Sequence, residues 1–133
     1  MRSLDNNHID TQVLPLRPGT LLLRSPHVIE HLPEPLKRWD KIYVPEPDPA
    51  EFPDYGPDDL TLISLYIDMN VLSVDERTVI ANSQAPRLVK TLESHGFTVI
   101  PVRHRHRRLF SGGFHCFTLD TVRDGSGPQD YLS

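Results

Sequence analysis

The most reactive side chain in this 133-residue chain is a single thiol near its C-terminus. Cys116 is the only cysteine, so it cannot form an internal disulfide, and three roles remain open: packing, metal coordination or nucleophilic catalysis. Gly112 and Gly113 precede it and suit a bend at which the backbone can approach a small ligand closely. A thiol on such a bend, with an imidazole supplied from elsewhere, is the arrangement that covalent catalysis requires.

A histidine and a carboxylate lie at the opposite end of the chain, in the sequence His8-Ile9-Asp10. Residues two positions apart in a strand share a face, so we expect His8 and Asp10 to point at the same pocket. By themselves these residues also fit an ordinary polar strand end. His115, next to Cys116, is expected to face the opposite way if that segment is extended, so we do not assign it as the base.

The elements that must position these residues fall into two successive units of the same layout. Each reads as strand, turn, strand, helix and strand, which predicts an α/β (α+β) fold of repeated ββαβ units, although a generic α/β domain would read similarly. In the first unit we expect strands at 11–16, 21–23 and 41–44, a turn at 17–20 and short helical turns within 29–39. In the second we expect strand residues within 62–73, a turn at 74–77, strands at 78–81 and 97–102, and a helix at 85–94.

The helix at 85–94 is the best defined of these elements. Leu88 and Leu92 share one face, Pro86 suits the first turn, and Gly96 suits the position just after the last turn.

The two units define the expected domain organisation. We predict a single domain over 1–133, with unit one at about 8–46 and unit two at about 60–125. The segment 45–59, rich in proline and acidic residues, connects them. It is either a solvent-exposed loop or a wall of the active site.

Composition and charge exclude several classes of function. A formal net charge of −4 and a pI near 5.9 give no overall attraction to nucleic acid or to a membrane. No run approaches the length of about 18 apolar residues that a spanning helix needs, and the N-terminus lacks the layout of a signal peptide. One unpaired cysteine fits a reducing compartment, so we expect a cytoplasmic protein.

A dense basic run, Arg103–Arg108, leads into the glycine bend. It is either a solvated loop or the lining of a pocket mouth that binds an anion. His104, His106, His115 and Cys116 could be combined as a metal set. Their spacing matches no structural zinc pattern, and metal binding would remove the nucleophilic role of the thiol, so we expect no metal.

Four ordered motifs resemble those of the amidinotransferases, which transfer an amidino group from arginine to an amine. The segment Gly112–Asp120 is similar to the family's nucleophile motif, Gly-Gly-Gly-Phe-His-Cys-x-Thr-x-Asp, with Ser111 in place of the first glycine. The second motif is matched by His8–Thr11, the family's Met-Asn-Val-Leu strand and turn by Met69–Glu76, and its terminal Gln-Ser-Tyr-Leu-Asp by Gly127–Ser133.

This resemblance implies a pentein fold, in which five ββαβ units surround a pseudo-fivefold axis. Members are several hundred residues long, so this chain would correspond to about the last two units, as a truncated C-terminal fragment. The aspartate that orients the catalytic histidine would lie upstream of Met1. No cofactor is implied.

The resemblance also implies a role for each site residue. Cys116 would attack the guanidino carbon of arginine and form an amidino-cysteine intermediate. His8 would protonate the leaving amine and then deprotonate the incoming one. Asp10 would hold the guanidinium through charge-assisted hydrogen bonds, while Ser64 and Arg24 would contact the donor's carboxylate.

Several functional alternatives remain open at the level of sequence. The acceptor amine could be glycine, lysine or inosamine phosphate, and the basic run suits a phosphorylated acceptor. Water could capture the intermediate instead, as in arginine deiminases. The chain could also be a non-catalytic fragment that acts only in assembly or binding, as a homo-oligomer or with a complementing N-terminal polypeptide.

Overall fold

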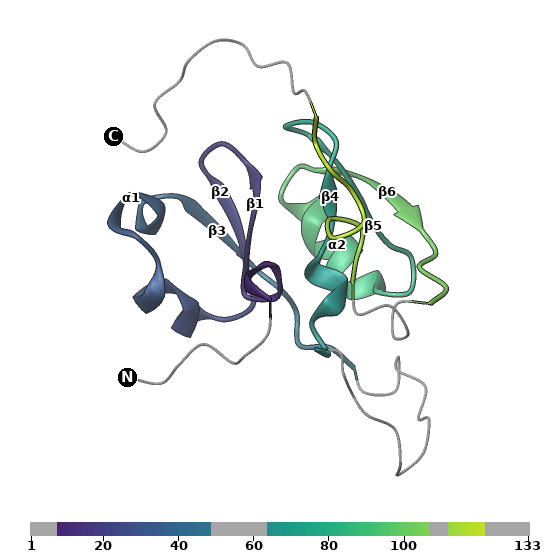
Figure 1. Cartoon of the computed structure of the whole chain (residues 1–133), viewed down its shortest axis with the longest axis horizontal. Helices are drawn as coiled ribbons and strands as arrows, with labels where there is room; N and C mark the ends of the chain where they lie inside the picture. Colours follow the sequence, from purple (N-terminus) through teal and green to yellow (C-terminus); the bar gives the residue numbers. More distant parts are fainter. Residues whose placement is uncertain (1–7, 49–63, 107–111, 122–133) are drawn as a thin grey trace.

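Two three-stranded sheets of the same topology form the framework of the molecule (Figure 1). The computed structural model describes residues 8–48, 64–106 and 112–121. The strand orders are β1-β2-β3 and β4-β5-β6, and in each sheet the first pair is antiparallel and the second parallel. The predicted ββαβ repeat of the α/β class is therefore confirmed.

The first sheet consists of β1 (Val13–Arg17), β2 (Thr20–Leu23) and β3 (Asp40–Tyr43). Gly19, with a φ of 80°, makes the tight turn between β1 and β2, a conformation that favours glycine. The crossover to β3 contains a 3₁₀ helix, η2 (Pro26–His31), and the four-residue helix α1 (Glu34–Lys37). Pro26 and Pro35 lie in the first turns of these helices, where proline is tolerated, whereas Pro33 follows η2 and separates it from α1.

The second sheet consists of β4 (Leu72–Ser73), β5 (Thr78–Asn82) and β6 (Thr98–Val102). Its crossover is the nine-residue helix α2 (Pro86–Ser94), which agrees with the predicted helix. Gly96, with a φ of 84°, follows α2 and turns the chain toward β6.

Two predicted strands are wrong in part. Within 62–73, the described residues form a 3₁₀ helix, η4 (Ile67–Met69), and only a two-residue strand. The His8-Ile9-Asp10 segment is a 3₁₀ helix, η1 (Ile9–Thr11), and not a strand. The backbone N–H and the hydroxyl of Thr11 both donate to the carbonyl of His8, which closes this turn. The predicted connection at 45–59 lies mostly outside the described residues.

One hydrophobic core joins the two units. Leu14, Leu22 and Ile42 from the first sheet pack with Val79 and Leu92 from the second unit. Leu21 and Leu23 point to the other face of β2, because successive strand residues alternate, and they pack with Val28 and Leu32 of the first crossover.

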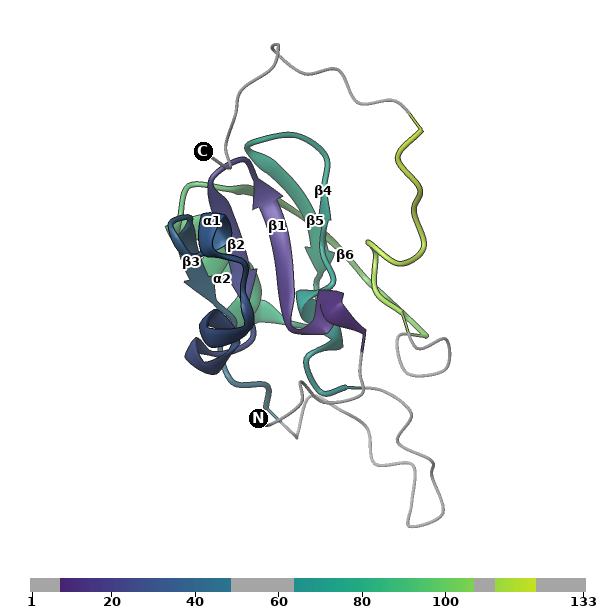
Figure 2. The ribbon, with the colours of Figure 1, turned by 60° about the vertical axis from the view of Figure 1, so that its left-hand side comes forward.

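A second view shows how the two sheets lie against each other (Figure 2). β1 of the first unit lies near β4 and β5 of the second. At the rim of this junction the guanidinium of Arg17 lies 4.6 Å from the centre of the Phe97 ring. None of the helices within the described ranges has the length and apolar character to cross a membrane.

We predict that Leu92→Ala lowers the free energy of unfolding by about 2–5 kcal/mol, because it leaves a cavity in the shared core. Leu92 has 0% exposure, whereas Leu119 has 85%. The matched control Leu119→Ala should change the free energy by about 0.5 kcal/mol or less. Urea denaturation followed by circular dichroism measures both, and equal losses would contradict this account of the core.

Candidate active site

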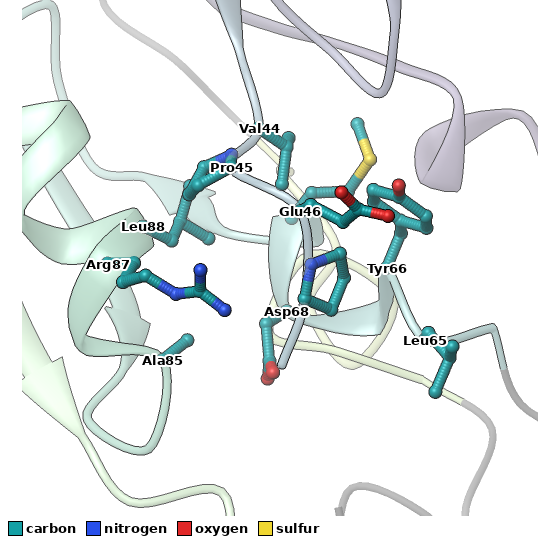
Figure 3. A pocket seen from close by; sticks show the side chains of 11 residues that line it. Val44, Pro45, Glu46, Leu65, Tyr66, Asp68, Ala85, Arg87 and Leu88 are labelled. Carbon is teal, nitrogen blue, oxygen red and sulfur yellow. The ribbon is translucent and has the colours of Figure 1, made fainter. Parts of the chain in front are cut away.

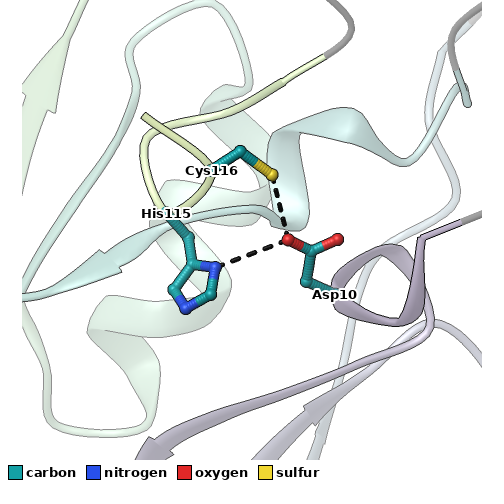
Figure 4. Close-up of side chains that lie close together, drawn as sticks. All are labelled: Asp10, His115 and Cys116. Carbon is teal, nitrogen blue, oxygen red and sulfur yellow. Dashed lines mark hydrogen bonds and ion pairs between the residues drawn. The ribbon is translucent and has the colours of Figure 1, made fainter. Parts of the chain in front are cut away.

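The thiol and the N-terminal carboxylate meet in the folded chain, although they are 106 positions apart in sequence. Cys116 Sγ donates to Asp10 Oδ2 at 3.0 Å (Figure 4). Cys116 lies in a turn at the surface, and Asp10 lies in η1. The side chains that sequence predicted as nucleophile and carboxylate therefore face each other.

Asn70, which follows η4, holds this pair together. Its side chain is 1% exposed, its Nδ2 donates to Asp10 Oδ2 at 2.7 Å, and its Oδ1 accepts from the backbone N–H of Cys116 at 3.0 Å. Its carbonyl also accepts from the backbone N–H of His115 at 3.3 Å. Asn70 belongs to the motif Met69–Glu76, but the sequence alone assigned it no role, because its partners lie far away in the chain.

Gly113 permits this close contact between the nucleophile turn and Asn70. A Cβ at Gly113 would lie 2.5 Å from Asn70 Cβ and 2.6 Å from its carbonyl oxygen. These distances are shorter than any side chain tolerates, so the absence of a Cβ is a steric requirement. The sequence predicted that the paired glycines let the backbone approach a small ligand, whereas the neighbour that Gly113 closely approaches is Asn70.

The placement of His115 differs from the prediction. The segment around it is a turn and not an extended strand, so alternation does not apply. His115 Nδ1 lies 3.4 Å from Asp10 Oδ2, on the same carboxylate oxygen that receives the thiol (Figure 4). An imidazole is therefore beside the thiol, and it comes from the adjacent residue.

His8 is exposed and precedes η1. Because the segment is helical, the predicted shared face with Asp10 is wrong. Among the described residues, the group of converging ligand-type atoms comprises Asp10, His115 and Cys116, without His8.

The carboxylate and the thiol shift each other's protonation. Burial by itself would raise the pKa of Asp10, but hydrogen bonds from Cys116, Asn70 and His115 together hold the pKa of this carboxyl below its ordinary value. Burial raises the pKa of the Cys116 thiol, and the negative charge of Asp10 raises it further. The carboxyl group is therefore charged and the thiol protonated at neutral pH.

Ser64 and Arg24, predicted to contact the donor's carboxylate, meet at Tyr66. Ser64 Oγ accepts from the backbone N–H of Tyr66 at 3.1 Å. The Arg24 guanidinium lies 4.4 Å from the centre of the Tyr66 ring. Ser64 therefore contacts the backbone of Tyr66, and Arg24 contacts its ring.

Two hollows lie near these groups. An open cleft of about 420 Å³ is lined by Leu14, Ser73, His115 and Asp120, so it runs along β1 and β4 beside the nucleophile turn. A second, small hollow of about 30 Å³ is lined by Glu46, Tyr66, Asp68 and Arg87, together with apolar side chains of α2 and of the segment after β3 (Figure 3).

The start of the basic run contacts the nucleophile turn. The ring of His104 lies 5.4 Å from Phe114 and 5.7 Å from Phe117, and these two phenylalanines flank His115 and Cys116. The later residues of the run, from position 107, are outside the described ranges.

The comparisons with known proteins agree with the motifs. No protein-family model matches the chain. It is 38% identical over 118 residues to the L-arginine:L-lysine amidinotransferase of Pseudomonas savastanoi pv. phaseolicola, and 35% identical over 122 residues to inosamine-phosphate amidinotransferase 1 of Streptomyces glaucescens. These alignments cover 89% and 91% of this chain but 31% and 34% of the relatives, so the chain spans about a third of their length.

A solved structure shows the same likeness in three dimensions. An amidinotransferase of the saxitoxin biosynthetic pathway from Microseira wollei matches with a TM-score of 0.76 and 36% identity, over 93% of this chain and 35% of that one. The two units therefore have the architecture of the pentein fold, as the resemblance implied. The chain is a homologue of amidinotransferases over about a third of their length.

We predict that Gly113→Ala speeds the alkylation of Cys116 by iodoacetamide near neutral pH. The added Cβ must push the turn away from buried Asn70, which separates the thiol from Asp10. Gly112→Ala is the comparison variant: its Cβ would meet Cys116 Cβ at 3.2 Å, a milder contact than the 2.5 Å one at Gly113, so it should change the rate less. An unchanged rate in Gly113→Ala would contradict the steric argument.

We predict that Asp10→Asn moves the pH profile of Cys116 alkylation to lower pH. The substitution removes the negative charge that raises the pKa of the thiol but keeps the size of the side chain. Asp40→Asn, at an exposed position in β3, should leave the profile in place. A shift to higher pH in Asp10→Asn would contradict the conclusion that the charge of Asp10 raises the pKa of the thiol.

Proposed function

We propose that the chain carries the nucleophilic half of an amidinotransferase site, which takes the amidino group of L-arginine onto Cys116 and passes it to an acceptor amine. The observation that carries the proposal is the 3.0 Å contact between Cys116 Sγ and Asp10 Oδ2. It joins a soft nucleophile to a carboxylate that can bind a guanidinium, in a chain related to amidinotransferases.

Asp10 would bind the substrate first. Its pKa is held below the ordinary value, so the carboxylate stays charged and can accept charge-assisted hydrogen bonds from a guanidinium. The bound cation would take the place of the thiol hydrogen on Oδ2, beside the Asn70 amide. This contact would hold the guanidino carbon next to the sulfur atom.

Substrate binding would also activate the thiol. In the unliganded site the charge of Asp10 keeps the pKa of Cys116 high, which disfavours the thiolate. A guanidinium bound to Asp10 neutralises that charge, so the pKa of the thiol falls when the substrate arrives. The thiol proton passes to a neighbouring imidazole, the thiolate forms an S–C bond to the guanidino carbon, and the C–N bond to ornithine breaks.

The leaving nitrogen needs a proton, and two imidazoles can supply it. The motif assigns His8 to this role, whereas the geometry adds His115, whose Nδ1 lies 3.4 Å from Asp10 Oδ2. Whichever imidazole donates this proton would then deprotonate the acceptor amine, and the amine would attack the amidino-cysteine. The rates of adduct formation in His8→Ala and His115→Ala distinguish the two assignments.

Other parts of the site would recognise the substrates. Arg24 and Ser64, which meet at Tyr66, would contact the donor's carboxylate. Arg103–Arg108 would attract a phosphorylated acceptor, because arginine suits phosphate. The aspartate that orients the histidine would come from a complementing polypeptide, and the single free thiol fits a cytoplasmic setting.

Incubation of the chain with L-arginine, followed by an acid quench and intact-mass spectrometry, tests this function. We expect a gain of one amidino group that is absent in Cys116→Ala. An acceptor amine should then remove the adduct, whereas citrulline release without an amine would assign hydrolysis. No adduct in a folded chain whose thiol still reacts with iodoacetamide would contradict a working nucleophilic half in these residues.

A further inference from the structure

We infer that Asp10, His115 and Cys116 form a zinc-binding site, at which Zn²⁺ reversibly blocks the thiol. Their carboxylate, imidazole and sulfur ligand atoms all lie within 4.8 Å of one another. These three donor types are the ones that bind Zn²⁺ in proteins. His115 and Cys116 come from one turn and Asp10 comes from η1, so the three ligand atoms converge only when the chain is folded.

The distances between the ligand atoms suit tetrahedral coordination. Zinc bond lengths of about 2.0–2.3 Å place neighbouring ligand atoms about 3.3–3.8 Å apart. Cys116 Sγ lies 3.0 Å from Asp10 Oδ2, and His115 Nδ1 lies 3.4 Å from the same oxygen. Small side-chain rotations would therefore admit the ion.

The surroundings of the set also suit a cation. The Asn70 amide, whose Nδ2 lies 2.7 Å from Asp10 Oδ2, fixes the orientation of this carboxylate in the way that outer partners orient metal ligands. Cys116 and His115 are exposed, which leaves an entry path and a fourth position for water. Zinc would form a bond to sulfur as the thiol proton leaves to solvent, with no change of oxidation state.

This set differs from the one considered in sequence, which contained His104 and His106. Neither belongs to the converging group among the described residues, and the ring of His104 packs on Phe114 and Phe117. The soft thiolate favours Zn²⁺ over Mg²⁺ or Ca²⁺. Competition between zinc and arginine for this site rests on the proposed function, because both would occupy the space between the sulfur and the carboxylate.

Titration of the metal-free full chain with Co²⁺ tests the site directly. Coordination by a thiolate gives a charge-transfer absorption band, which we expect at one Co²⁺ per chain and which Zn²⁺ should abolish by displacement. Cys116→Ser should lack the band. His115→Ala and Asp10→Asn should weaken binding by about tenfold or more, since loss of an outer partner alone has effects of about that size.

His106→Ala is the matched control, because it removes an exposed histidine that is outside the group. It should bind Co²⁺ as the unaltered chain does. Saturating Zn²⁺ should also protect Cys116 from iodoacetamide. No band and no protection in a folded chain, or equal loss of binding in His106→Ala and His115→Ala, would overturn the site. The Co²⁺ titration contains no arginine, and the test with L-arginine contains no metal. The metal site and the proposed function can therefore fail independently of each other.

Discussion

The amide of one buried residue, Asn70, joins the two distant ends of the chain. Its Nδ2 donates to Asp10 while its Oδ1 accepts from the backbone N–H of Cys116. A buried amide whose donor and acceptor are both used fixes its neighbours, because breaking either bond leaves a buried polar group without a partner. The nucleophile turn also presses its Gly113 backbone against this residue. The geometry of the candidate site therefore depends on Asn70.

The three donors that meet on Asp10 explain the chemistry of the unliganded site. The thiol, the His115 ring and the Asn70 amide all approach one oxygen, which keeps the carboxylate charged. The same charge keeps the thiol protonated until a cation arrives. A guanidinium would supply this positive charge, and the converging atoms of Asp10, His115 and Cys116 would also offer ligands to a competing zinc ion.

The repeated ββαβ unit explains where the site lies. η1 precedes the first sheet, η4 precedes the second, and the nucleophile turn follows β6. The shared core holds the two sheets together, so segments at their ends converge. Amidinotransferase relatives are about three times as long as the part that this chain matches.

Sequence by itself determined the repeat, the helix predicted at 85–94 and found at 86–94, the turn at Gly19, the nucleophile motif and the likeness to amidinotransferases, because these follow from local periodicity, turn chemistry and motif order. It did not determine the local path of two site segments. Thr11 closes η1 where a strand was predicted, and the turn at His115 reverses its expected direction. Only the tertiary structure decided that His115 lies beside the thiol and that Asn70 connects the site. Their partners lie far away in sequence, and neither propensity nor alternation encodes such contacts.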